Sequence, residues 1–263
     1  FFQGTMYNFG IHNNTSEGQF TDGAGAVIEN GAFFNNTVVY NHSRGSLRQS
    51  GGIQVYRDKG AGALKIYNCI SLFNEGFKVY QGEAGSNRLV GTKNFSVGNT
   101  GGNIECYNTI TEKLENINIT AGYLQKITFD NTCIAVTENI FIGDYMREQA
   151  NLRLKDKSKG LNMGNDTPML DDETIFLEDY TDMDFANRIK DCRVDAGAYE
   201  SENKDNIKHT TGTKVVNGKT VITATYYVTQ TGIGSSSGEN PANAACAMNL
   251  QRGLNHAGHT AHA

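Results

Sequence analysis

One eight-residue pattern recurs along the first half of the chain and constrains its fold more than any other feature. An aromatic residue comes first, Asn comes second and eighth, and the residues between them alternate or are apolar. The copies are YNFGIHNN (Tyr7–Asn14), FNNTVVYN (Phe34–Asn41) and YNCISLFN (Tyr67–Asn74). Gly-rich stretches with further short alternating strands separate the copies, so each repeat consists of two or three short strands joined by turns.

A repeat of this kind cannot bury its apolar face alone, so it must stack on copies of itself. Parallel stacking would place equivalent residues about 4.8 Å apart along the stack. Asn side chains at corresponding turns could then hydrogen-bond to one another as a ladder, which would satisfy buried polar groups. We assign these turns to Asn8, Asn35, Asn68, Asn94, Asn108 and Asn131. Ile11, Val38, Val39 and Ile70 are the expected interior positions.

These features predict an all-β protein folded as a right-handed parallel β-helix, which is a solenoid. A β-sandwich is the main alternative, but it would show strands about every 8–12 residues without a shared motif. The composition agrees with many strands and tight turns, because the chain has 30 Gly, 29 Asn and only 2 Pro and because Gly and Asn tolerate positive φ angles.

Charge and hydropathy exclude two classes of protein. The net charge is −5, whereas nucleic-acid-binding proteins usually carry a basic face; we expect no nucleic-acid partner. No apolar run approaches the roughly 18 residues that a membrane-spanning helix needs, so we expect no transmembrane segment.

The second half of the chain contains segments of a different kind. ANLRLKDKSKGLNMGND (Ala150–Asp166) is followed by TDMDFANRIKDCRVDAGAYE (Thr181–Glu200). These segments resemble the terminal block of bacterial secreted or surface β-helix proteins, which are pectate-lyase-like solenoids of the choice-of-anchor type. The match is clearest at VDAGAYE (Val194–Glu200), and the chain departs from the pattern at Lys159, Phe185 and Asn187. The resemblance implies a β-helix in an extracellular or bacterial cell-surface setting.

Charged residues of both signs lie close together within this block. We interpret them as a salt-bridged cap over the open last turn of the solenoid, since terminal repeats must cover exposed strand edges. A calcium site at Asp182 and Asp184 is an alternative, because paired carboxylates suit a hard cation. We expect no other cofactor. The residues concerned are Asp182, Asp184, Arg188, Asp191, Arg193 and Asp195.

The last segment, Tyr226–Gly258, resembles the opening of the same β-helix proteins, with Pro241 in place of a Trp. Ala247, Leu250, Leu254 and Ala257 have helical spacing, which predicts a short capping helix near the C-terminus. We therefore divide the chain into β-helix rungs (1–149), a capping block (150–200), a linker or exposed hairpin around Asn217-Gly218 (201–225) and the start of a second β-helix-like unit (226–263). This order suggests a slice of a tandem array, and we expect the residues after about Ala224 either to pack on another chain or to be poorly ordered in isolation.

The fold alone does not define the function. Enzymes of the resembled group need carboxylates and bases gathered on one outward face, whereas Glu29, Arg57, Asp58, Lys65, Lys78 and Glu105 are scattered without repeated pairing. We therefore predict a non-catalytic stalk or adhesin that binds glycans or surface proteins. The alternative is a polysaccharide lyase or glycosidase. Candidate ligand-binding residues are Tyr7, Tyr40, Tyr56, Tyr67 and Tyr80.

Overall fold

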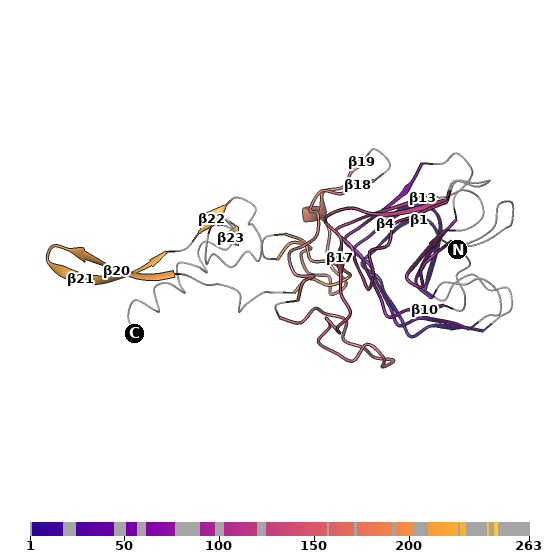
Figure 1. Cartoon of the computed structure of the whole chain (residues 1–263), viewed down its shortest axis with the longest axis horizontal. Coiled ribbons are helices and arrows are strands. Elements are labelled where there is room, and N and C mark those ends of the chain that lie inside the picture. Colours follow the sequence, from indigo (N-terminus) through magenta and orange to yellow (C-terminus); the bar gives the residue numbers. More distant parts are fainter. Residues whose placement is uncertain are drawn as a thin grey trace.

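The computed structural model describes an all-β protein with parallel sheets (Figure 1). The described residues are 2–17, 25–44, 51–56, 62–76, 90–97, 103–119, 125–156, 158–170, 173–190, 193–201, 210–225, 227–229, 241 and 245–246. Within these ranges, helical structure is limited to the 3₁₀ turn η1 (Leu177–Asp179) and a 3₁₀ residue at Pro241, and no helix is long and apolar enough to cross a membrane. The predicted capping helix lies outside the described residues.

Three sheets share the first half of the chain. The nine-stranded sheet A contains β1 (Phe2–Tyr7), β4 (Ala26–Phe34), β7 (Ile53–Val55), β8 (Leu64–Tyr67), β11 (Val90–Gly91), β12 (Phe95–Val97), β13 (Asn103–Tyr107), β15 (Ile117–Ile119) and β16 (Gln125–Phe129). Sheet B contains β2 (Gly10–His12), β5 (Thr37–Val39), β9 (Ile70–Leu72), β14 (Ile110–Thr111) and β17 (Ile134–Ala135). Sheet C contains β3 (Thr15–Ser16), β6 (His42–Ser43) and β10 (Glu75–Gly76).

Each copy of the repeat contributes one strand to each sheet. We call such a set of strands a rung: β1, β2 and β3 form the first, β4, β5 and β6 the second, and β8, β9 and β10 the third. Equivalent strands pair in parallel, so Tyr7 is in register with Phe34, Phe34 with Tyr67, and Tyr67 with Tyr107. The aromatic first position of the motif therefore forms one column along the rungs.

The second position of the motif forms the first corner of each rung. Asn8, Asn35, Asn68 and Asn108 all adopt left-handed backbone conformations, with φ between 47° and 59°. Asn enters this region more readily than other residues with a side chain. The Asn68 Nδ2 donates to Asn35 Oδ1 at 3.3 Å. The repeated Asn is thus required by the sharp turn from sheet A to sheet B.

The eighth position of the motif lies at the second corner, where the chain turns from sheet B to sheet C. Its Asn side chains form the predicted amide ladder. Asn14 Nδ2 donates to Asn41 Oδ1 at 2.9 Å, and Asn41 Nδ2 donates to Asn74 Oδ1 at 3.0 Å. Asn74 Nδ2 in turn donates to Asn94 Oδ1 at 3.0 Å. Asn94 therefore belongs to this ladder, because its side chain lies beside Asn74, whereas Asn108 lies at the first corner.

Apolar residues fill two distinct regions around sheet B. Val38 belongs to the cluster between the sheets, and Ile11 packs against that cluster, as predicted. Val39 and Ile70 instead face outward, where they join a second cluster with residues from 136 to 196. Both are buried, as interior positions should be, but against this second cluster, because sheet B is covered on both sides and its strands β5 and β9 are buried throughout.

The capping block (150–200) lies along the flank of the rungs rather than over an open end (Figure 1). Gly197 N–H donates to the Asn68 carbonyl at 2.7 Å, and Ala198 N–H donates to Thr37 Oγ1 at 3.0 Å. Asn108 Nδ2 donates to the Met163 carbonyl at 2.8 Å. The block lies here, and not over the open end as predicted, because side-chain amides of the first corner point outward and donate hydrogen bonds to its backbone.

Two antiparallel pairs lie outside the three sheets. β18 (Met169–Leu170) pairs with β19 (Glu173–Thr174) inside the capping block. β20 (Thr210–Val216) and β21 (Lys219–Thr225) form the predicted hairpin, and its turn residues Asn217 and Gly218 have φ angles of 52° and 75°. In the 226–263 unit, β22 (Val228–Thr229) pairs in parallel with β23 (Ala245–Cys246).

Candidate functional site on the outer face of sheet A

Alternate residues of β8, β13 and β16 face away from the core of the rungs. Leu64, Ile66, Ile104, Cys106, Ile127 and Phe129 belong to the inner cluster. Because side chains alternate along a strand, the residues between them share the opposite face of sheet A. These outward residues are Lys65, Tyr67, Asn103, Glu105, Tyr107, Lys126 and Thr128. We call this set the outer row.

The strand register brings charged members of the outer row together. Glu105 lies directly opposite Lys65 on one side and Thr128 on the other. Lys126 lies opposite Asn103, which places its side chain diagonally from Glu105. Within the described part of the chain, Lys65 and Lys126 form no ion pair at 4 Å or less. Neither ammonium group is therefore bound by a carboxylate of the described residues.

Tyr107 supplies a hydroxyl donor beside this carboxylate. Its Oη donates to Glu105 Oε2 at 2.9 Å. Partial burial raises the pKa of the Tyr107 phenol well above its usual value, and the hydrogen bond and charge of Glu105 raise it further. Asp130, just beyond the end of β16, acts on the same phenol. The phenol consequently stays protonated at neutral pH and holds Glu105 in place.

An aromatic pair borders the outer row. The rings of Tyr67 and Tyr107 stack with centroids 4.7 Å apart and planes 13° apart. Leu170 and Leu177 of the capping block cluster with Tyr67. Burial raises the pKa of Tyr67, and a hydrogen bond with the Met169 backbone opposes this rise. The capping block therefore forms one wall beside the outer row.

Of the five tyrosines predicted to bind ligand, Tyr7 and Tyr67 belong to the aromatic column, and the described Tyr40 and Tyr56 lie elsewhere. Tyr67 is buried under the capping block, whereas Tyr7 is 37% exposed and stacks on Phe34 with centroids 5.3 Å apart. Tyr40 occupies the second corner with φ 53°. Tyr56 is half-buried after β7, and Tyr80 lies outside the described residues. Their role in ligand binding stays a prediction.

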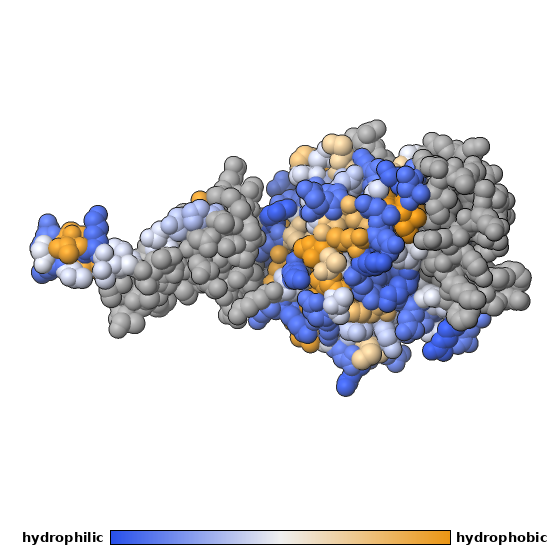
Figure 2. Space-filling view, viewed as in Figure 1, coloured by the Kyte–Doolittle hydropathy of each residue, from blue (hydrophilic) through white to orange (hydrophobic). Residues whose placement is uncertain are grey.

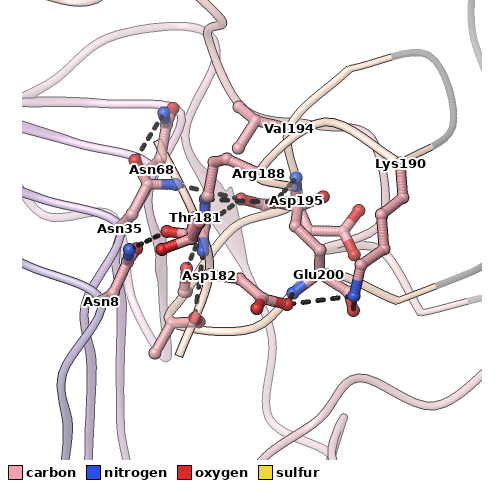
Figure 3. A network of polar contacts seen from close by, with 12 residues as sticks. Asn8, Asn35, Asn68, Thr181, Asp182, Arg188, Lys190, Val194, Asp195 and Glu200 are labelled. Carbon is pink, nitrogen blue, oxygen red and sulfur yellow. Dashed lines mark hydrogen bonds and ion pairs between the residues drawn. The ribbon is translucent and has the colours of Figure 1, made fainter. Parts of the chain in front are cut away.

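The two carboxylates proposed for calcium each have partners within the protein, and Figure 3 shows those of Asp182. Asp182 is almost fully buried and accepts hydrogen bonds from the Glu200 backbone N–H at 3.0 Å and from Lys190 Nζ at 3.1 Å. Asp184 binds Arg153, whose Nε donates at 3.0 Å. In the described ranges, no group of three or more His, Cys, Asp or Glu residues could hold a metal ion. A calcium site at this pair therefore stays a prediction.

Arg188 lies at the centre of this buried network (Figure 3). Its side chain has no exposed surface, and its Nε lies 3.2 Å from Glu200 Oε1. Its Nη1 donates to the Ala198 carbonyl at 3.0 Å. Burial, followed by the nearby Asp195 carboxylate, raises the pKa of Glu200. The network connects the two halves of the 182–200 segment, so loss of one charged partner would leave the other buried without a partner.

Sequence reasoning missed the outer row because it judged Lys65 and Glu105 to be unrelated. Both residues stand two positions before an aromatic-Asn pair, in KIYN and ECYN. Alignment of the repeats on Asn68 and Asn108 would have placed them side by side. No protein family, curated protein or solved structure is found to match this chain.

Proposed function

We propose that the rungs form a right-handed parallel β-helix and that the protein is a secreted or cell-surface protein of the stalk or adhesin kind. The parallel registers and the ladder from Asn14 to Asn94 support the solenoid. The resemblance of Val194–Glu200 to bacterial surface proteins supports the extracellular setting.

The outer row is the surface that we propose binds a glycan. The observation that carries this proposal is the register of Lys65, Glu105 and Thr128 beside Tyr107. Hydroxyl, amide and carboxylate groups on neighbouring strands can bind sugar hydroxyls, and the ammonium groups of Lys65 and Lys126 can bind a sugar carboxylate. An acidic glycan therefore fits this face better than a neutral one.

A polysaccharide lyase or glycosidase is the second candidate. It is favoured by the hydrogen bond between Glu105 and Tyr107 and by the second carboxylate, Asp130, which acts on the same phenol. A carboxylate and a protonated phenol could serve as general base and general acid. A lysine could neutralise the carboxylate of a bound uronate.

Binding and cleavage should be measured together. The full chain is tested against neutral and uronate-containing polysaccharides, with assays for new reducing ends and for unsaturated products that absorb ultraviolet light. We expect binding of acidic glycans without cleavage, and about tenfold weaker binding after Lys65→Met or Glu105→Gln. Lys113→Met, which removes an exposed lysine outside the outer row, is the matched control and should bind normally.

Two results would contradict the adhesin proposal. Cleavage that is lost in Glu105→Gln would establish the enzyme instead. Equal glycan binding by the wild type, Lys65→Met and Glu105→Gln would show that the outer row is not the binding surface.

A further inference from the structure

The β20–β21 hairpin presents two exposed faces. Cross-strand partners share a face, and residues two apart along a strand share it too. The pairs Lys214–Val221 and Val216–Lys219 therefore lie on one face, which we call the docking face. Val216 and Val221 on it are 46% and 42% exposed. Figure 2 shows apolar side chains at this end of the molecule.

A hairpin of this kind is only marginally stable by itself. Two strands without a packed third element do not bury enough apolar surface to be stable in water. Every residue from Gly212 to Val221 is exposed. The docking face would therefore gain stability from a partner that covers Val216 and Val221.

Charge indicates which partner the docking face would accept. Lys214 and Lys219 are the only charged residues between 210 and 225, and both lie on the docking face. The whole chain nevertheless has a net charge of −5, so the rest of it carries a net charge of −7. A second copy of this chain is thus electrostatically attractive to the hairpin.

The capping block offers a matching surface around β18, β19 and η1. Glu173, Glu178 and Asp179 are exposed there, and none of them forms an ion pair with a described residue. Met169 and Phe176 on the same segment are 49% and 52% exposed. We call these five residues the acidic surface. It combines negative charge with apolar area, as the docking face combines positive charge with apolar area.

We propose that the docking face of one copy binds the acidic surface of a second copy. Figure 1 shows the hairpin far from β18 and β19 in its own molecule, which favours a contact between molecules. The two surfaces differ, so the contact is head-to-tail and leaves one free surface at each end of a growing row of molecules. A face of two short strands is small, so the association is weak and concentration-dependent.

Sedimentation velocity of the full chain over a series of concentrations tests this proposal. We expect association that weakens as salt rises, because salt screens exposed charges. Lys214→Glu/Lys219→Glu and, separately, Glu173→Lys/Glu178→Lys/Asp179→Lys should each lower the affinity by about tenfold. Mixing these two charge-reversed variants should restore association between them. The control variant Lys113→Glu/Lys159→Glu changes the net charge by the same amount as the hairpin variant, but at exposed sites outside both proposed surfaces.

The proposal fails if the wild type sediments as a monomer at every concentration in low salt. It also fails if the two charge-reversed variants do not associate when mixed, or if the control lowers the affinity as much as the hairpin variant does. Circular dichroism shows whether each variant is folded. Val216→Thr/Val221→Thr, which keeps strand propensity, should weaken association without any change in charge.

Discussion

At the second corner, the Asn41 side chain hydrogen-bonds to the Asn residues of the rungs before and after its own, and its Nδ2 donates to Asn74 Oδ1 at 3.0 Å. Asn41 Oδ1 accepts hydrogen bonds from the backbone N–H and from Nδ2 of Asn14. Nδ2 also donates to the Ile11 carbonyl at 3.0 Å. One buried amide thus connects three successive rungs.

Asn41→Ala should lower the free energy of unfolding by about 2–3 kcal/mol, because it leaves buried donors and acceptors unpaired. Asn14→Ala is the matched control: Asn14 is exposed at the end of the ladder, so its loss should cost about 1 kcal/mol. Chemical denaturation measures both. Equal costs at the two positions would contradict a ladder that spans the rungs.

The ladder ends on Glu112, which should make stability depend on acid pH. Burial alone would raise the pKa of Glu112, but hydrogen bonds from Lys93, Asn94 and the Phe73 backbone outweigh it and lower this pKa below its usual 4.5. The ionised carboxylate therefore stabilises the fold above about pH 4.5. This contribution is lost as the pH falls through the lowered pKa of the folded state.

Glu112→Gln should consequently be less stable than the wild type at pH 7, and the difference should shrink as the pH falls below 4.5. Thermal unfolding from pH 7 to pH 3 measures it. Glu17→Gln, which removes an exposed carboxylate beside Arg44, should change stability little. A difference for Glu112→Gln that stays constant with pH would rule out this linkage.

Arg188 should be the most sensitive charged residue of the capping block. Its buried guanidinium faces Glu200 at 3.2 Å, so Arg188→Met would leave buried acceptors without a donor and should cost about 3–5 kcal/mol. Arg153→Met removes a half-exposed arginine that binds Asp184 and should cost about 1 kcal/mol or less. Denaturant titration of both variants compares them. Similar losses would show that the buried network does not hold the block.

The rung organisation could be predicted from the sequence because the motif repeats the same chemistry at the same two corners. Asn68 occurs at the first corner, which needs a residue with left-handed backbone conformation, and Asn74 occurs at the second corner, which needs an amide for the ladder. The position of the capping block could not be predicted in this way. The side of the rungs on which the block packs depends on hydrogen bonds between its backbone and residues of the first corner. The hydrogen bond from Gly197 N–H to the Asn68 carbonyl, for example, involves backbone atoms only and cannot be recognised from the pattern of side chains.

The outer row was missed for a different reason. Lys65 and Glu105 are 40 residues apart, and only the parallel register makes them neighbours. Their charges are ordinary for a solvated surface when read along the chain. The hydrogen bond from Tyr107 to Glu105 depends on the same strand geometry.

The register of Lys65 and Glu105 is the central claim, and a designed disulfide tests it most directly. In-register neighbours on parallel strands have Cα atoms about 4.8 Å apart, which lies within the range of about 4.4–6.8 Å for a disulfide. Lys65→Cys/Glu105→Cys should therefore cross-link on mild oxidation, as peptide mapping would show. Lys65→Cys/Asn103→Cys, offset by two residues on the same face, should not. A cross-link in the offset pair, or none in the in-register pair, would contradict the arrangement of the outer row.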